Sequence, residues 1–253
     1  MTNNLKVSII TVTYNSSKTI LDTVKSLEMQ SYQNIEYIIV DGSSSDNTLE
    51  IISTYCTRVT KVISEPDSGI YDALNKGINA ATGDMVGFLH SDDLFAYDDA
   101  VKDIVSTIES QGTDAVHADL EYVDKEDTNK RIRLWKSSVY LAKKLKRGWM
   151  PAHPTFYMKR EKYIQYGAFD LTYKIAADYD SLLRYFGMYG ITSAYLPKVL
   201  IKMRVGGASN RSLENLIQKT REDIRALRSN GLSWPYAIFI KNISKIPQFL
   251  GSR

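Results

Sequence analysis

The sequence predicts an α/β protein whose mostly parallel sheet is flanked by helices. Apolar runs rich in β-branched residues alternate with stretches that have the periodicity of amphipathic helices. Two such strand–helix units fit into about fifty residues at the start of the chain, which is the spacing of a doubly wound parallel sheet. With 253 residues, of which 43% are hydrophobic and 24% charged, the chain can bury the core of one such domain.

Four strands are expected in the first part of the chain. The first, 6–15, is nearly continuous in apolar and β-branched residues, as a strand buried on both faces should be. Ser16 and Ser17 then offer a helix cap ahead of an apolar stripe at 20–27. The other expected strands are 35–40, 59–64 and 85–89, and the other expected helices are 49–55, 70–78 and 98–109.

The second half of the chain has weaker patterns. Its expected features are a strand at 114–119, a charged hairpin-like segment at 121–133, a basic patch at 141–147, a helix that opens at Asp178 and a long helix at 210–228. A tail at 234–250 contains no acidic residue. Because it is too short and too interrupted to span a bilayer, it suits either a helix at a membrane interface or an arm packed on the domain.

Polar side chains at the ends of three expected strands predict a binding site. Thr13 and Tyr14 end the first strand, Asp41 the second, and Asp92 with Asp93 the fourth. The carboxyl ends of parallel strands meet at one edge of a sheet, where ligands bind. Paired carboxylates at such an edge suit Mg²⁺ or Mn²⁺ carrying phosphates, and an Asp-rich helix cap is the structural alternative.

Several classes of function and location are excluded. No G-x-G-x-x-G follows the first strand and no P-loop occurs, which argues against a dinucleotide site. No nucleic-acid partner is expected, because the chain has no recognisable nucleic-acid-binding motif and no long Lys/Arg run. The single cysteine, Cys56, excludes an internal disulfide framework. With neither signal-peptide features nor a membrane span in the sequence, a cytoplasmic location is expected.

The net charge of +3 is unevenly distributed along the chain. Residues 1–135 hold 22 acidic and 11 basic side chains, whereas 136–253 hold 7 acidic and 21 basic ones. This asymmetry favours a metal-dependent half joined to a half that faces something anionic, either phosphates or an anionic membrane surface.

A resemblance to known enzymes rests on four short segments. They are SIITVTYN at 8–15, DGS at 41–43, SEPDSGIYDALNKG at 64–77 and SDD at 91–93. In combination they resemble the family 2 glycosyltransferases of the GT-A fold, and within them the small bacterial enzymes of O-antigen, capsule and colanic-acid assembly. The similarity is dense over 5–95 and returns at 149–209.

The resemblance implies a Rossmann-like GT-A catalytic domain at 1–209, followed by a C-terminal helical arm. Within the domain, 1–95 would bind the nucleotide sugar and 96–209 the acceptor. The segment 210–253, helical and basic, would form the arm, which would either associate with a membrane or pack on the domain.

The resemblance also implies roles for individual residues. Thr11 and Tyr14 would line the nucleotide base, and Asp41 would accept a hydrogen bond from the uracil N–H. Asp92 would lie by the ribose and the metal, and Asp93 would hold Mn²⁺ or Mg²⁺. These residue types suit the task, because a carboxylate accepts from a base N–H and an aromatic ring stacks on a base.

On the acceptor side, Asp178 matches the family's general base at the start of a helix, and capping of that helix is the alternative role. Asp180 is a second acidic position, but two residues on a helix point about 200° apart, so only one can face the acceptor hydroxyl. His90 stands where many relatives have Asp and would be either a metal ligand or a cap. His153, between two prolines, lies in an aromatic stretch that resembles the acceptor-side segment.

Two further candidates are Lys76 and Arg204. Arg204 precedes a glycine-containing segment at 206–209 that would allow a loop to close over the diphosphate.

The implied reaction is metal-dependent, inverting transfer from a UDP-sugar to a hydroxyl of a polyprenyl-diphosphate-linked saccharide. It would serve bacterial surface polysaccharide synthesis at the inner face of the cytoplasmic membrane. A nucleotidyltransferase is one alternative, but it would need a basic, glycine-rich loop that 11–15 does not offer. The other alternative is a catalytically silent sugar-nucleotide-binding or scaffold protein of an envelope assembly complex. Four acidic candidates present together argue against it: Asp41, Asp92, Asp93 and Asp178.

Overall fold

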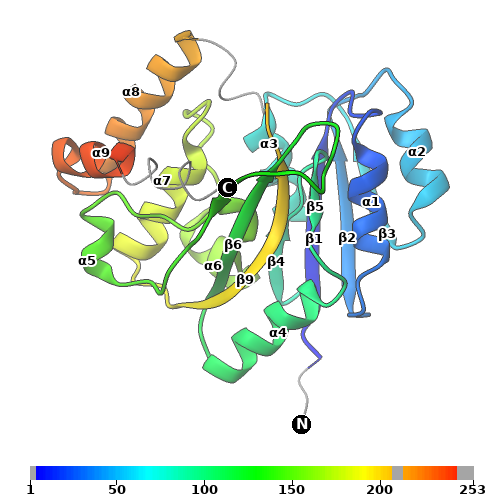
Figure 1. The fold of residues 1–253 in the computed structure, drawn as a ribbon, viewed down its shortest axis with the longest axis horizontal. Coiled ribbons are helices and arrows are strands. Elements are labelled where there is room, and N and C mark those ends of the chain that lie inside the picture. The colour runs from blue at the N-terminus through cyan, green and yellow to red at the C-terminus, as the bar shows by residue number, and fades with distance from the viewer. Residues whose placement is uncertain (1–3, 207–212, 244–253) are drawn as a thin grey trace.

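The structure, a computed structural model, describes residues 4–206 and 213–243 and contains one sheet with helices on both faces (Figure 1). The described strands are β1 Val7–Thr13, β2 Ile35–Asp41, β3 Val59–Ser64, β4 Met85–Phe88, β5 Asp93–Phe95, β6 Ala115–Val123, β7 Arg131–Trp135, β8 Tyr157–Lys159 and β9 Ser193–Arg204. Their order across the sheet is β3-β2-β1-β4-β8-β6-β9-β5, with β7 beside β6. The predicted α/β fold is confirmed.

The helices cover the sheet in two layers, one on each face. The α-helices are α1 Ile20–Glu28, α2 Thr48–Tyr55, α3 Ile70–Ala80, α4 Ala100–Gln111, α5 Ala142–Leu145, α6 Arg160–Tyr166, α7 Ala177–Leu183, α8 Leu213–Ser229 and α9 Trp234–Ile243. A 3₁₀ turn, η1, spans His153–Thr155, and a π-helical turn, η2, spans Arg184–Met188. Buried apolar side chains of α1, α2 and α4 form one core cluster, and those of α3 and α5 to α9 contribute to the other.

The first four strands are parallel neighbours, as predicted. All seven residues of β1 are buried, and β1 pairs with β2 on one side and β4 on the other. Thr13 lies opposite Asp41, and Asp41 lies opposite Ser64. The first three strands therefore end side by side at one edge of the sheet.

The second half of the sheet is mixed rather than parallel. Strand β8 runs antiparallel to β4 and β6, while β6 and β9 are parallel. Directly after the fourth strand, the short strand β5 pairs antiparallel with β9, so that Asp93 lies opposite Met203. The sequence did not predict β5, because three residues are too few to show a strand periodicity.

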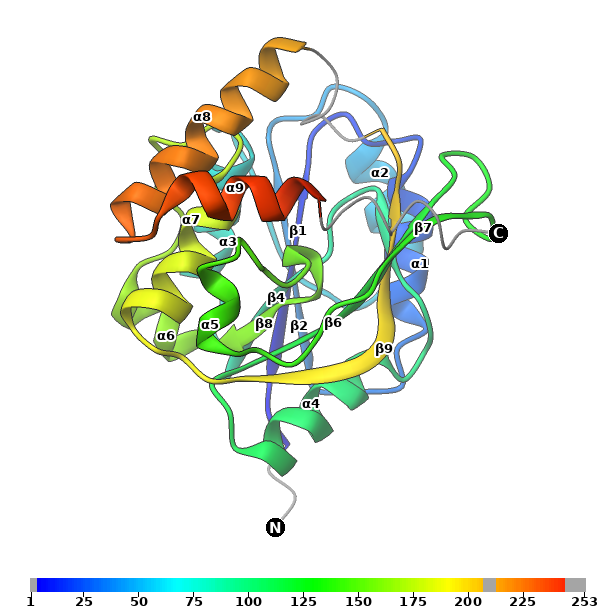
Figure 2. The same cartoon turned by 60° about the vertical axis from the view of Figure 1, so that its left-hand side comes forward.

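The C-terminal helices α8 and α9 lie beside α7 on one side of the molecule (Figure 2). Ala226 and Leu227 of α8 and Ala237 of α9 are completely buried in the same core cluster as α3 and α7. The predicted arm is thus part of the main core, while its predicted start at 209/210 falls outside the described residues, as does the segment 207–209. Within the described residues, no helix is long and apolar enough to cross a membrane.

A close contact between Gly87 and Tyr157 yields a test of the sheet packing. A Cβ atom on Gly87 of β4 would lie 2.0 Å from a ring carbon of the completely buried Tyr157. We expect Gly87→Ala to lower the free energy of unfolding by about 3 kcal/mol, the upper end of usual overpacking penalties.

Denaturant unfolding followed by circular dichroism measures this change. Gly187→Ala is the matched control, since a Cβ there would meet its nearest neighbour, Leu145, at an ordinary 3.8 Å. Equal stability of the two variants would contradict the packing of Tyr157 on Gly87.

Candidate functional site

The loops after β1 and β2 form one corner of the predicted site. Asn15 and Ser43 have positive φ angles of 48° and 62°, an uncommon backbone conformation for residues other than glycine. The two loops are joined because the Asn15 backbone N–H donates to Ser44 Oγ at 2.8 Å and the Asn15 side chain accepts from the Ser45 N–H at 2.9 Å. The connection holds the chain that carries Tyr14 against the chain that carries Asp41.

Tyr14 is available to stack on a ligand. Its side chain is 65% exposed, and it lies next to Gly42. A Cβ on Gly42 would lie 2.6 Å from a side-chain oxygen of Asp67 and 3.4 Å from the Tyr14 ring, so a larger residue here would displace the Asp67 carboxylate. The sequence analysis did not single out Asp67, which stands in the quoted segment 64–77 and approaches the same corner.

Asp41 is completely buried and already has partners in the fold. One carboxylate oxygen accepts the Ser44 hydroxyl, and the other accepts the Ser44 N–H at 3.0 Å and the Ser64 hydroxyl at 2.7 Å. An ionised carboxylate has about four acceptor positions, and these contacts occupy three of them. Asp41 therefore ties the ends of β2 and β3 together.

Thr11 does not fit its predicted contact with a base. It is completely buried, and its hydroxyl lies 2.6 Å from the Leu89 carbonyl oxygen and 2.9 Å from the Tyr37 hydroxyl. Both faces of the sheet are covered by helices, so the Thr11 side chain lies in the protein interior. Through the Leu89 carbonyl oxygen, the Thr11 hydroxyl contacts the chain at the end of the fourth strand, directly before His90.

The two adjacent carboxylates differ in their surroundings. Asp92 is partly exposed, whereas Asp93 is completely buried in β5 and neither of its oxygens has a hydrogen-bond partner. The sequence predicts both carboxylates at the end of the fourth strand, but of the two only Asp92 is partly exposed there. Burial raises the pKa of Asp93 well above its usual range, the neighbouring Asp92 raises it further, and Arg204 opposes the shift.

Arg204 and Lys76 are both engaged within the protein. The Arg204 guanidinium pairs with the Asp22 carboxylate and donates to the backbone oxygens of Asp92 at 3.0 Å and Lys125 at 3.2 Å. It therefore fixes the backbone of Asp92 rather than lying free for a diphosphate. The Lys76 ammonium, on α3, lies 2.9 Å from Glu65 and donates to the Pro66 carbonyl oxygen at 2.8 Å, so it supports the segment that precedes α3.

The residues present fit a divalent cation that a ligand helps to hold. The orphaned oxygens of Asp93 and the buried, unpartnered Nδ1 of His90 lie on the segment that follows β4. The described part of the chain contains no cluster of three or more His, Cys, Asp or Glu residues that could enclose a metal alone. Mg²⁺ is commonly bound by one or two carboxylates together with substrate phosphates, which is what this segment offers.

Asp178 lies at the start of α7. It is partly exposed, and its Oδ1 accepts the Tyr179 N–H at 2.8 Å and the Tyr71 hydroxyl at 3.2 Å. The Tyr71 hydroxyl also approaches the Ile175 carbonyl oxygen at 2.6 Å. Burial and Asp178 raise the pKa of Tyr71, so this phenol stays protonated and donates. The sequence analysis missed Tyr71, although it lies in the motif that carries the resemblance.

His90 and His153 share the environment of Asp178. Burial lowers the pKa of both histidines, and the charge of Asp178 acts on both in the opposite direction. His153 also stacks on Phe88 of β4, with ring centroids 5.4 Å apart. The fold thus brings the end of β4, the start of α7 and the Pro-flanked His153 together from both halves of the chain.

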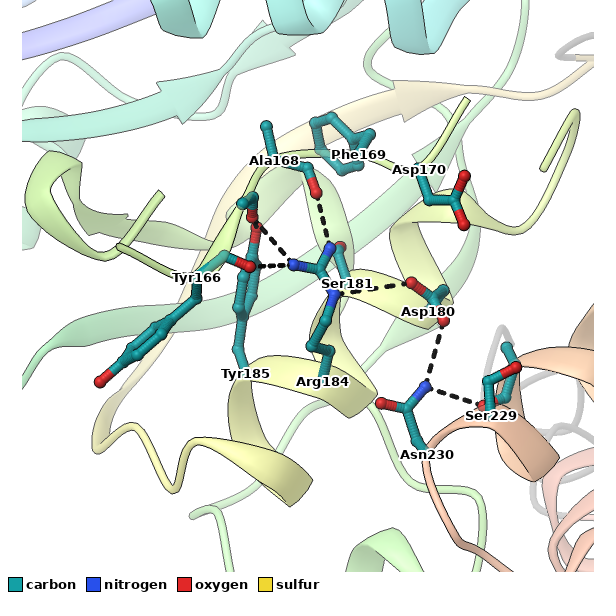
Figure 3. A network of polar contacts seen from close by, with 12 residues as sticks. Tyr166, Ala168, Phe169, Asp170, Asp180, Ser181, Arg184, Tyr185, Ser229 and Asn230 are labelled. Atoms are coloured by element: carbon teal, nitrogen blue, oxygen red, sulfur yellow. Dashed lines mark hydrogen bonds and ion pairs between the residues drawn. The ribbon is translucent and has the colours of Figure 1, made fainter. Parts of the chain in front are cut away.

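Asp180 points away from this group, as the helical spacing predicts. Its carboxylate lies 3.7 Å from the Arg184 Nε and accepts from the Asn230 side chain at 3.1 Å (Figure 3). Burial raises its pKa. Arg184 also donates to the carbonyl oxygens of residues 166–168, so Asp180 belongs to a network that joins α7 to the chain after α8.

Comparison with known proteins identifies the family. The model of "Glycosyl transferase family 2" matches residues 8–175. The chain belongs to this family. The resemblance drawn from the four sequence segments is thereby confirmed.

Two curated relatives come from Mycobacterium tuberculosis. The chain is 29% identical over 242 residues to a "PGL/p-HBAD biosynthesis glycosyltransferase", a match that covers 91% of each chain. It is 40% identical over 113 residues to an uncharacterized glycosyltransferase, covering 44% of this chain and 43% of the relative. In that second match the chain spans less than half the length of its relative.

Solved structures share the fold. Residues 1–349 of TarS from S. aureus, in complex with UDP-GlcNAc, match with a TM-score of 0.70 at 20% identity, over 98% of this chain and 72% of that one. The mannosyltransferase PcManGT from Pyrobaculum calidifontis, in complex with GDP-Man and Mn²⁺, matches with a TM-score of 0.62 at 19% identity, over 98% and 76%. These similarities confirm a GT-A fold.

The buried histidines give a prediction for pH dependence. Burial lowers the pKa of His117 to about 4 and that of His153 to about 4, against about 6.5 in an unfolded chain. Between these values the unfolded state binds more protons, so the free energy of unfolding falls as the pH falls from 6.5 towards 4. Each group contributes up to about 3 kcal/mol to this fall.

Proton NMR checks the cause directly, because the chain has only three histidines. The ring signals of His117 and His153 should stay constant from pH 7 to 5, and His117→Asn and His153→Asn assign them. A signal of either residue that titrates near pH 6.5 in the folded protein would contradict the prediction.

Proposed function

We propose that this protein transfers a sugar from a UDP-sugar to a hydroxyl group, with inversion at the anomeric carbon. The observation that carries the proposal is that Asp178, a partly exposed carboxylate, lies close enough to His90 for its charge to act on the pKa of that histidine, in the segment after β4 that also carries the unpartnered carboxylate Asp93. Family membership and the UDP-GlcNAc complex of TarS support this chemistry.

Each end of the site has a separate task in this proposal. The exposed ring of Tyr14 stacks on the base, and Asp41 accepts its N–H. Asp178 accepts the proton of the acceptor hydroxyl as that oxygen attacks the anomeric carbon and the bond from that carbon to the UDP oxygen breaks. Asp92 and Asp93 would hold Mn²⁺ or Mg²⁺, which supplies neutralisation of the departing diphosphate. The Mn²⁺ complex of PcManGT supports such a cation.

The proposed acceptor is a polyprenyl-diphosphate-linked saccharide at the cytoplasmic face of a membrane, in surface polysaccharide synthesis. Two surface features support a peripheral location. Val139 and Leu141 are exposed beside the basic patch 141–147. On α9, Tyr236 and Phe239 are 52% and 60% exposed. Residues 224–253 contain no acidic side chain, which suits an anionic lipid surface.

The base assignment is tested by a matched pair of variants. We expect Asp178→Asn to bind UDP normally but to lose transfer by about 10²-fold or more, the usual value of general-base catalysis. Asp180→Asn should retain most of its transfer activity and lose stability instead, because it removes a partner of Arg184 and Asn230.

The measurements are calorimetric titration with UDP, transfer rate and thermal unfolding. Full transfer by Asp178→Asn together with an inactive but folded Asp180→Asn would reverse the two roles.

The metal assignment is tested by Asp93→Asn, which keeps the shape of the side chain and removes its charge. We expect Mn²⁺ binding in the presence of UDP, measured by calorimetry, to be lost. The melting temperature of the metal-free protein should not fall, since a buried carboxylate without partners is itself unfavourable.

Asp98→Asn, at an exposed acidic residue just past β5, serves as the control and should bind Mn²⁺ normally. Unchanged Mn²⁺ affinity in Asp93→Asn would contradict the assignment of Asp93 as a metal ligand. Release of UDP that persists in the presence of EDTA would contradict it as well.

A further inference from the structure

The segment that leads into α7 is held by a carboxylate from the C-terminal helix α8. The backbone N–H groups of Lys174, Ile175 and Ala176 all donate to Glu222, at 3.1, 2.8 and 2.9 Å. Glu222 is only 8% exposed, and Gln218, one turn earlier on α8, donates to it at 3.0 Å. Three successive N–H groups that converge on one anion form a strong, charge-assisted site.

This contact holds the start of α7, because the Ala176 N–H is one of the first four N–H groups that have no partner within a helix. Ala176, the residue before the first turn, has no side chain that can accept a hydrogen bond from the helix start. The Glu222 carboxylate instead lies at this positive end of the helix. Burial by itself would raise the pKa of Glu222, but the N–H groups of Ile175, Lys174 and Ala176 outweigh it and lower the pKa. Glu222 is therefore ionised at neutral pH.

The same short segment is held from its other side by the nucleotide-binding half. The Tyr71 hydroxyl of α3 approaches the Ile175 carbonyl oxygen at 2.6 Å and Asp178 Oδ1 at 3.2 Å. The backbone N–H groups of 174–176 thus bind Glu222 on α8, whereas the Ile175 carbonyl oxygen and the Asp178 carboxylate bind Tyr71 on α3. Asp178 lies two residues past the last N–H that Glu222 accepts.

We propose that Glu222 is a positioning residue for Asp178, and that α8 thereby completes the acceptor side of the site. This inference rests on the proposed function, in which Asp178 is the base. A small displacement of a reacting group is enough to reduce turnover strongly, so a carboxylate that never touches the substrate can control the rate. The arm then acts in catalysis as well as in packing.

Other contacts between α8 and this region allow the test to be made on a folded protein. The Asn230 side chain binds Asp180 at 3.1 Å, and Arg225 binds the side chain of Thr172. Ala226 and Leu227 remain buried in the core. Loss of the Glu222 carboxylate should therefore release the segment 174–176 without detaching α8.

The experiment compares Glu222→Ala and Glu222→Gln with Glu214→Gln, a control at an exposed acidic residue on the same helix. We expect kcat to fall by about tenfold to 10²-fold in Glu222→Ala and less in Glu222→Gln, which keeps one acceptor oxygen. UDP affinity should be unchanged, because Tyr14 and Asp41 lie on other elements. Amide hydrogen exchange of residues 174–176 should be faster in both variants and unchanged in the control.

A double-mutant cycle decides whether Glu222 acts through Asp178. In an Asp178→Asn background, Glu222→Gln should cause no further loss of transfer. If it lowers transfer by the same factor in both backgrounds, or if UDP affinity falls in parallel, the inference is overturned. Should Glu222→Ala fail to fold, Glu222→Gln alone supports these comparisons.

The cycle separates this inference from the proposed function. Wild-type transfer by Asp178→Asn would refute the base assignment, and the positioning role with it. Impaired Asp178→Asn beside a fully active, folded Glu222→Ala would refute the positioning role alone. Unchanged amide exchange at 174–176 in the Glu222 variants would refute the contact between Glu222 and these N–H groups, whatever the transfer activities are.

Discussion

The parallel pairing of β1 with β2 and β4 is the constraint on which the candidate site depends. Every residue of β1 is buried, so both faces of the strand are specified by packing. A slip of one residue would move its whole set of side chains to the opposite face, which makes the register strongly determined. With Thr13 held opposite Asp41, the loops that carry Tyr14 and Asp41 must emerge together.

Buried acidic side chains are stabilised in different ways, and the differences separate structural from functional groups. Asp41 has hydroxyl and N–H partners, Asp180 has Arg184 and Asn230, and Glu222 has three backbone N–H groups. In the part of the chain that the structure describes, Asp93 is the one buried carboxylate whose two oxygens both lack a partner. Such a group is unfavourable without a proton or a cation, which is why it supports a binding role.

The surroundings of Asp178 are assembled from distant parts of the chain. Tyr71 on α3 and Glu222 on α8 hold opposite sides of the segment that leads to Asp178. One of these helices belongs to the half that would bind the nucleotide, and the other to the C-terminal arm. Because both contact the same few peptide groups, α3, the segment before α7 and α8 meet at one junction.

The sequence by itself determined the first four strands, the edge at which they end, the family and the divergence of Asp178 from Asp180. The strands, their edge and the divergence of the two carboxylates follow from local periodicity and helical geometry, which need no distant contact, whereas the family follows from the resemblance of four short segments. Only the tertiary structure decided the burial of Asp93, since its strand β5 exists through pairing with β9. It also decided that Thr11, Arg204 and Lys76 are occupied by internal partners and that Tyr71 and Glu222 meet at one segment. Such contacts join residues far apart in sequence, and no local pattern encodes them.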